Sequence, residues 1–301
     1  MSDPSESLVS LAAYDDSHEA VVTAVRQLTR STTWVMVGRV PFDFATHHPQ
    51  GITRGHDHRL YLSTAEITEA TQPYESPVDG YDRTPGRGQG HVFVTNDEGA
   101  ALGQVSLGED TIYHPGGIDF DGEWLWVPTA EYRPDSRSIV YRVDPNTLAV
   151  HEAFRFDDHI GGIVRDRETG LLHAVTWGSR RLLTFTTEGR LTHRVDVKSH
   201  FVDYQTCVTA GVGHMVCTGI AEYPLAGPGV FSLGGIAIVD IASGRIEHEA
   251  PVTTLSPAGR VVTYNAVHLE IDGSVLRMFA APDDGEAAGD SHLLTLETAL
   301  A

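Results

Sequence analysis

Three histidines stand at the start of closely similar short segments. His114 and His159 open the segments HPGGI and HIGGI, and His48 opens HPQGI. Unprotonated imidazoles bind Mn, Fe, Ni or Zn through one ring nitrogen. If the three segments are equivalent parts of a repeat, their histidines converge on one point. The pattern therefore predicts that His48, His114 and His159 hold one divalent metal ion.

Two more segments share this register but carry other polar residues. Tyr204 takes the histidine position in DYQTC, and Asn265 takes it in YNAVH. We expect Tyr204 to move a proton through its hydroxyl group, and Asn265 to bind the substrate or to complete the coordination of the metal. His47 and His268 stand next to these positions and are second choices, with His268 expected to contact the substrate.

Three glutamates recur after a pair of small or apolar residues. Glu66 and Glu131 both end the triplet TAE, Glu222 ends IAE, and Asp283 follows Pro282 in a fourth copy. A carboxylate that accepts the second N–H of a metal-bound histidine fixes its tautomer and orientation. We expect Glu66, Glu131 and Glu222 to lie behind the histidines and to supply the acid or base. Repeated His and Glu could equally be hydrogen-bonding devices between repeats.

Residues near this constellation could contact an organic ligand. Tyr132 and Tyr223 can supply aromatic walls, and Arg180 can hold one carboxylate. The segment from 68 to 90 and the shorter segment from 225 to 233 read as long loops, which are typical of lids or binding loops.

The repeats indicate which elements position these side chains. Copies start at His48, His114, His159, Tyr204 and Asn265, close to the period of propeller blades once two insertions are allowed. Short apolar runs alternate with turn signals such as Asp121-Gly122 and Asp272-Gly273. The sequence therefore predicts an all-β fold, a five-bladed β-propeller with the histidines at the upper rim of its central channel. We expect the glycines that follow the histidines to widen the channel mouth.

The ends of the chain must close this ring. Residues 34–40 form an orphan strand that we expect to pair with residues 292–297, since an unpaired edge invites aggregation. Apolar residues between His18 and Leu28 recur at helical spacing and predict a short helix. We therefore expect an N-terminal arm over residues 1–31 and one propeller domain over residues 32–301.

Three long motifs carry a resemblance to a known group of proteins. They are YHPGGIDFDGEWLWVP, AEYRPDSRSIVYRVDP and FDDHIGGI. Through them the sequence resembles a family of uncharacterised bacterial β-propeller proteins, from about Val40 onward. The resemblance implies the fold and brings no activity with it.

Composition limits the partners and the compartment. Lys and Arg number 21 against 41 Asp and Glu, so the net charge of −20 disfavours nucleic acid and anionic membranes. The acidic, polar N-terminus does not form a secretory signal peptide. With two cysteines, Cys207 and Cys217, we expect free thiols and a cytoplasmic protein. The oligomeric state stays open.

These observations lead to two hypotheses of function. The first is a metal-dependent lyase, isomerase or hydrolase that acts on a small polar organic molecule in the upper channel. The alternative is a non-catalytic propeller that binds a ligand or protein, with structural rings of His and Glu. No dinucleotide-binding, P-loop or serine-hydrolase motif is present.

Overall fold

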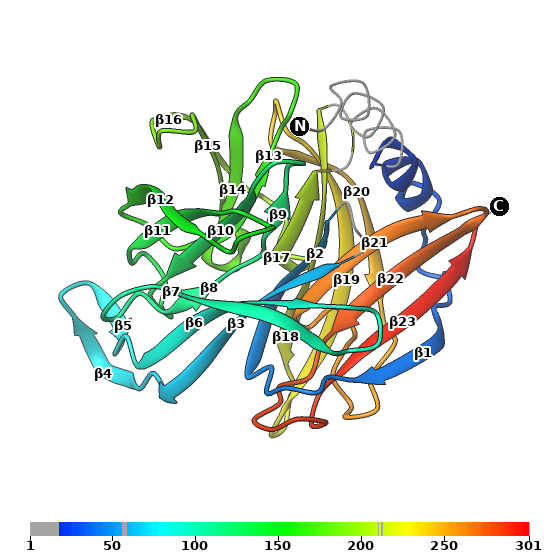
Figure 1. The fold of residues 1–301 in the computed structure, drawn as a ribbon, viewed down its shortest axis with the longest axis horizontal. Helices are drawn as coiled ribbons and strands as arrows, with labels where there is room; N and C mark the ends of the chain where they lie inside the picture. Colours follow the sequence, from blue (N-terminus) through cyan, green and yellow to red (C-terminus); the bar gives the residue numbers. More distant parts are fainter. Residues whose placement is uncertain (1–17, 56–58, 210, 212, 301) are drawn as a thin grey trace.

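Short strands with apolar residues on alternate positions account for most of the chain. The computed structural model describes residues 18–55, 59–209, 211 and 213–300, so residues 1–17 of the predicted arm and part of the turn at Gly55–Asp57 lie outside the described residues. Within the described residues, five antiparallel sheets form the blades of a β-propeller, as predicted (Figure 1).

The first three blades follow one another along the chain, each running from the axis outward. Blade 1 contains β2 (His48–Arg54), β3 (Leu60–Glu69), β6 (Arg87–Thr95) and β7 (Ala101–Leu107). Blade 2 contains β8 (His114–Pro115) and β9 (Asp119–Phe120), then β10 (Leu125–Ala130), β11 (Ser138–Val143) and β12 (Val150–Phe156). Blade 3 contains β13 (Ile160–Arg165), β14 (Leu172–Thr176), β15 (Arg181–Phe185) and β16 (Leu191–Asp196), with the 3-10 turn Trp177–Ser179 between its middle strands.

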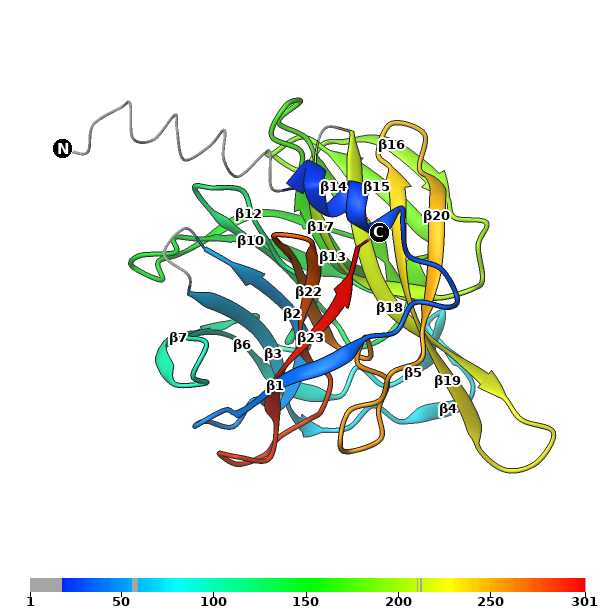
Figure 2. The same cartoon turned by 90° about the vertical axis from the view of Figure 1, so that its right-hand side faces the viewer.

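The last two blades complete the ring. Blade 4 contains β17 (Asp203–Thr209), β18 (His214–Pro224), β19 (Val230–Asp240) and β20 (Arg245–Val252). Blade 5 contains β21 (Ala266–Asp272), β22 (Val275–Ala281), β23 (His292–Ala299) and, as its outermost strand, β1 (Val35–Pro41). β1 pairs with β23 from Val35 opposite Glu297 to Pro41 opposite His292. The predicted closure of the ring is thus confirmed, and Figure 2 shows β1 beside β23.

Apolar side chains fill the spaces between neighbouring blades. Each of five buried clusters joins one pair of adjacent blades. Side chains that point to opposite faces of one strand therefore serve different neighbours. Val216 packs toward blade 5, while Met215 and Cys217 pack toward blade 3.

A short helix covers the junction of blades 4 and 5. The predicted helix spans residues 18–25 and ends three residues before Leu28. Val21, Val22, Val25 and Leu28 are buried in the cluster that these two blades share. The boundary between an arm over 1–31 and a domain over 32–301 stays a prediction. None of the helices in the described residues is long and apolar enough to span a membrane.

The first of the two predicted long loops is largely strand, and the second is partly so. β3 and β6 extend as a paired ribbon to Glu69 and Arg87, and between them β4 (Pro73–Val78) and β5 (Tyr81–Arg83) form a second hairpin. β18 and β19 likewise remain paired out to Pro224 and Val230. The insertions are therefore extensions of the second and third strands of their blades. The prediction of an irregular loop was wrong for most of residues 68–90, and in the second segment residues 225–229 do form a loop.

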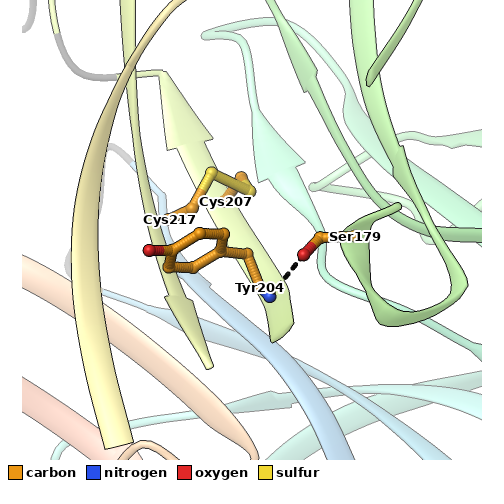
Figure 3. The surroundings of a disulfide bond; sticks show 4 residues. All are labelled: Ser179, Tyr204, Cys207 and Cys217. Carbon is orange, nitrogen blue, oxygen red and sulfur yellow. Dashed lines mark hydrogen bonds between the residues drawn. A yellow bond between two sulfur atoms is a disulfide. The ribbon is translucent and has the colours of Figure 1, made fainter. Parts of the chain in front are cut away.

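The prediction of two free thiols was also wrong. Cys207 in β17 and Cys217 in β18 lie directly opposite each other, with a Cα–Cα distance of 4.0 Å, and form a disulfide (Figure 3). The disulfide could not be predicted from the sequence, because it requires the hairpin register that places Cys207 opposite Cys217. Disulfides persist in oxidising compartments, so the cytoplasmic prediction loses the support that free thiols gave it.

Candidate functional site

A polar pocket of about 350 Å³ opens at the ends of the innermost strands where the predicted histidines stand. All five blades contribute to it. Its lining consists of His48, Gln50, His114, Gly116, Tyr132, His159, Gly161, Thr176, Trp177, Gly178, Asp203, Tyr204, Gln205, Ile220, Ala221, Glu222, Tyr264 and Asn265. The structure thus brings together the five residues that share one register in the repeats.

Irregularities in the innermost strands build the floor of this pocket. The pairing register shifts between Pro49 and Gly51, between Ile160 and Gly162, and between Tyr204 and Thr206. In blade 2 the innermost strand is interrupted between β8 and β9 at the same place. A bulge turns its extra residue out of the regular ladder. The turned-out residues, which all line the pocket, are Gln50, Gly116, Gly161 and Gln205.

Glycines on these strands let the backbones meet at the axis. A Cβ atom on Gly116 would lie 2.1 Å from the carbonyl oxygen of Gly161, and one on Gly117 would lie 2.7 Å from that of Gln205. The Gly117 N–H donates to the Gly161 carbonyl at 2.8 Å, and the Thr206 hydroxyl donates to Gln50 O at 2.9 Å. The glycines therefore let neighbouring backbones meet at the axis, and Gly116 and Gly161 also line the pocket. That they widen the channel mouth stays a prediction.

His48 is oriented by a carboxylate from blade 5. Its Nδ1 lies 2.8 Å from Asp284 Oδ1, and Arg260 donates to the other carboxylate oxygen at 2.7 Å. Burial alone would raise the pKa of Asp284, but the hydrogen bonds from His48 and Arg260 lower it to about 2. The ionised carboxylate accepts a hydrogen bond from the Nδ1–H group, so Nε2 is the nitrogen of His48 that is left for a ligand.

His159 is held in the same tautomer by a main-chain group. Its Nδ1 lies 2.9 Å from the carbonyl oxygen of Glu131. Because a carbonyl can only accept, Nδ1 carries the proton. Burial lowers the pKa of His159 to about 4, so the ring is neutral at pH 7 and its Nε2 has a free lone pair.

His114 lies between these two histidines and differs from both. Its side chain is only 4% exposed, yet neither ring nitrogen hydrogen-bonds to another described residue. Burial and the neighbouring His48 and His159 hold its pKa well below the usual range, so the ring is neutral. Tyr132 stacks on it with ring centroids 4.0 Å apart. Buried polar atoms normally have a hydrogen-bond partner, so this unpaired imidazole is unusual.

The three rings are near neighbours without forming a closed cage. Ring centroids are 5.7 Å apart for His48 and His114, and 6.3 Å apart for His114 and His159. In the described part of the chain, two other groups of at least three His, Cys, Asp or Glu have ligand atoms within 4.8 Å of one another, and the three predicted ligands are not such a group. A shared ion would have to draw the rings together.

Several other predicted residues reach the pocket. Tyr132 and Asn265 line it, and Asn265 donates to Pro282 O at 3.0 Å while lying 3.4 Å from Asp284. Glu222 lines it from β18 and is exposed, and among the described residues no partner holds its carboxylate.

The other two predicted glutamates have their carboxylates engaged elsewhere. Glu131 is fully buried and accepts from Thr111 at 2.7 Å, from Arg133 at 2.6 Å and from Arg137 at 2.6 Å. Glu66 Oε2 lies 3.3 Å from His91 Nε2, at the top of blade 1. Neither carboxylate lies behind a predicted metal ligand, and that role belongs to Asp284 and to the main chain of Glu131.

Four further residues that were predicted to act in the site have polar contacts with other parts of the protein. Tyr204 borders the pocket, but its hydroxyl donates to Glu249 at 2.6 Å, and burial followed by this bond raises its pKa (Figure 3 shows its ring beside the disulfide). The remaining three do not line the pocket and have polar contacts as follows: Tyr223 with Phe201 O at 2.5 Å, Arg180 with Asp203 at 2.8 Å, and His268 with Glu270 at 3.3 Å.

Sequence reasoning missed important parts of the site. Asp284 was passed over for its neighbour Asp283, which accepts from Ser256 at 2.8 Å instead. Trp177 forms an edge contact with His159, with ring centroids 4.8 Å apart. It begins the 3-10 turn of blade 3, where the pattern of the other blades is interrupted. The Trp177-Gly178 pair directly after an apolar strand, where other blades carry a glutamate or an aspartate, was the signal that could have found it.

Comparisons with solved structures give likenesses of fold. A luciferin-regenerating enzyme is 10% identical, with 90% of this chain and 96% of that chain covered and a TM-score of 0.47. A protein of unknown function from Bacteroides caccae is 10% identical, with coverage of 88% and 94% and a TM-score of 0.46. Hydrazine synthase from Kuenenia stuttgartiensis is 15% identical, with 82% of this chain covered and a TM-score of 0.42. This chain spans only 58% of that one.

Sequence comparison identifies the family. No curated protein matches the chain. Residues 9–296 match the sequence profile of a family of unknown function, DUF6454, and this match covers most of the chain. The expectation of an uncharacterised propeller family is confirmed, and the chain belongs to DUF6454.

Proposed function

We propose that the upper pocket is the active site of a metal-dependent enzyme in which His48, His114 and His159 bind one divalent transition metal ion. The observation that carries this proposal is the state of His114, a buried neutral imidazole whose two ring nitrogens have no partner among the described residues. It lies between two histidines whose Nδ1 atoms are already engaged. Ligation would satisfy a group that is otherwise costly to bury.

The chemistry of the donors fits Mn, Fe, Ni or Zn. Neutral imidazole suits each of these ions, and a carboxylate or carbonyl on the second ring nitrogen is the usual support. Such ligand atoms lie about 3.3 Å apart around a tetrahedral ion. The rings would therefore move toward one another on binding. Their position at a pocket wall, where one side is open, allows that movement.

The walls favour a small polar organic substrate. Tyr132, Trp177 and Tyr264 offer aromatic faces, and Gln50 and Gln205 offer amides from the floor. The net charge of −20 disfavours nucleic acid and anionic membrane surfaces as partners. A bound metal would act as a Lewis acid on a substrate oxygen. Glu222 is then the available base, because the carboxylates of Glu66 and Glu131 are engaged. This assignment suits a lyase, isomerase or hydrolase.

Metal stoichiometry in matched variants tests the proposal. Wild-type protein, stripped with chelator and dialysed against Zn²⁺ or Mn²⁺ at pH 7, should bind one equivalent more than His114→Ala. His151→Ala removes an exposed histidine in β12 and should bind as much as the wild type. If His114→Ala is folded and binds as much metal as the wild type, the proposal is wrong.

A second function is favoured by the spacing of the rings. Because their ligand atoms do not lie within 4.8 Å of one another, the pocket could instead bind a polar ligand without metal. His114 would then hydrogen-bond to the ligand itself. Native mass spectrometry of protein purified with chelator distinguishes the two. A retained small molecule that is lost in His114→Ala would favour the ligand-binding propeller.

A further inference from the structure

A second cluster of metal-binding side chains lies at the top of blade 1, outside the upper pocket. His47 precedes β2, Glu66 belongs to β3 and His91 belongs to β6. One ligand atom from each lies within 4.8 Å of the other two. The rings of His47 and His91 face each other at 25° with centroids 5.8 Å apart. Unlike the three histidines of the pocket, this group is already close enough to share an ion.

The spacing within the cluster fits a tetrahedral metal. Glu66 Oε2 and His91 Nε2 are 3.3 Å apart. Two ligands at zinc–nitrogen and zinc–oxygen distances of about 2.0–2.2 Å subtend about 3.3 Å at the tetrahedral angle. Small side-chain adjustments would therefore be enough to seat the ion between them.

Each histidine has its Nδ1 atom near another polar group. His47 Nδ1 lies 3.2 Å from Glu286 Oε2, and His91 Nδ1 lies 3.4 Å from the Ser106 hydroxyl. Contacts of this kind fix the ring and leave Nε2 for a metal. Glu286 comes from the connection between β22 and β23, so blade 5 helps to orient a ligand of blade 1.

The backbone of His47 is held in a costly conformation. Its φ is +52°, in the left-handed region that residues with a side chain rarely adopt. Reciprocal main-chain hydrogen bonds with Gly285, at 2.8 and 2.9 Å, keep it there. Strain of this kind persists where the surroundings over-determine it, and it is concentrated at functional positions. Here the constrained backbone fixes the direction in which the side chain of His47 leaves the main chain.

Access also suits a metal. The Glu66 side chain is 42% exposed, whereas that of His91 is 10% exposed. Solvent therefore reaches the cluster from the Glu66 side, and a fourth coordination position would be open to water.

We propose that His47, Glu66 and His91 form a second site for a divalent transition metal of the zinc type, with three protein ligands and one open position. The site is independent of the metal in the upper pocket. Three protein ligands with a water in the fourth position are the arrangement of catalytic rather than purely structural zinc.

Zinc titration in a background without the pocket site tests this proposal. His114→Ala should bind one Zn²⁺ at pH 7 by calorimetry, and Zn²⁺ should raise its melting temperature. Adding Glu66→Gln should weaken that binding by more than the roughly 10- to 100-fold that loss of an outer hydrogen-bond partner costs. Glu69→Gln is the matched control, because Glu69 is an exposed residue of the same strand and should leave zinc binding unchanged.

The outcomes separate this site from the pocket. If His114→Ala/Glu66→Gln binds Zn²⁺ as tightly as His114→Ala, the second site does not exist. If wild type and His114→Ala bind equal amounts while Glu66→Gln loses one equivalent, the second site stands and the pocket site fails. His91→Ala should repeat the effect of Glu66→Gln. If His91→Ala fails to fold, Glu66→Gln still tests the second site, because the side chain that it changes is partly exposed.

Discussion

Replacing Glu131 by glutamine tests whether its carboxylate stabilises the fold or takes part in catalysis. The Glu131 side chain is fully buried and Arg133 is 10% exposed, whereas Arg137 is 56% exposed. Removing one partner of a buried ion pair costs about 3–5 kcal/mol, since the other charge is left without compensation. Glutamine keeps one acceptor oxygen but turns an amide toward a guanidinium group, so we expect a loss of about 3 kcal/mol.

The exposed partner should matter much less. Arg137→Gln breaks a pair that is largely in solvent, so we expect a loss of about 1 kcal/mol or less. Glu98→Gln, on an exposed turn, is the control for changing one charge and should leave stability unchanged. Urea unfolding at pH 7 followed by circular dichroism measures all three differences.

The effect of Glu131 should also depend on pH. Burial opposes ionisation, but the donors Arg137, Thr111 and Arg133 outweigh it and lower the pKa of Glu131 below its usual value. A lowered carboxyl pKa contributes stability above the unfolded value of about 4.3, and this is lost as the pH falls through the folded value. The gap between wild type and Glu131→Gln should therefore narrow below about pH 4. A stable Glu131→Gln protein that loses only its metal would refute the structural assignment.

Three further predictions concern the floor, the disulfide and the buried histidines. Gly116→Ala should cost about 3 kcal/mol or prevent folding, whereas Gly161→Ala, whose Cβ would meet nothing closer than 3.7 Å, should be tolerated in thermal unfolding. Denatured protein should show no free thiol without reductant and two after reduction, and Cys207→Ala/Cys217→Ala should cost about 2–3 kcal/mol for a separation of 10 residues. Two reactive thiols without reductant would contradict the pairing. Burial lowers the pKa of His159 and His173 to about 4, so between about pH 6.5 and pH 4 the unfolded state binds more protons than the folded state, and each histidine lowers the free energy of unfolding by up to about 1.4 kcal/mol per pH unit as the pH falls. Unfolding free energies that are equal at pH 7 and pH 5 would contradict this.

The propeller could be predicted because the sequence patterns that indicate its strands and turns are local and recur from blade to blade. Three copies carry a histidine two or three residues before a glycine, and the other two carry Tyr204 and Asn265 in the same register. The innermost strands begin within one residue of the predicted starts. The orphan strand at Val35–Pro41 could be assigned by elimination, since the last repeat lacked an outer strand. Neither inference needed the direction of any side chain.

The missed parts of the site depend on side-chain direction. Side chains alternate along a strand, so a one-residue irregularity changes which face a residue serves. Asp284 reaches His48 while Asp283 turns to Ser256, and the carboxylate of Glu131 turns to Arg133 while its carbonyl reaches His159. Bulges at equivalent places in three innermost strands likewise turn Gln50, Gly161 and Gln205 out of the regular ladder, and no residue type marks them reliably.

The most direct test of the account is where a metal binds in a crystal. Crystals of the protein grown with Zn²⁺ should give an anomalous difference peak in the upper pocket, about 2.0–2.1 Å from one ring nitrogen each of His48, His114 and His159. Data collected on both sides of the zinc absorption edge identify the element. An upper pocket without such a peak, or with a peak that does not contact His114, would contradict the proposed active site.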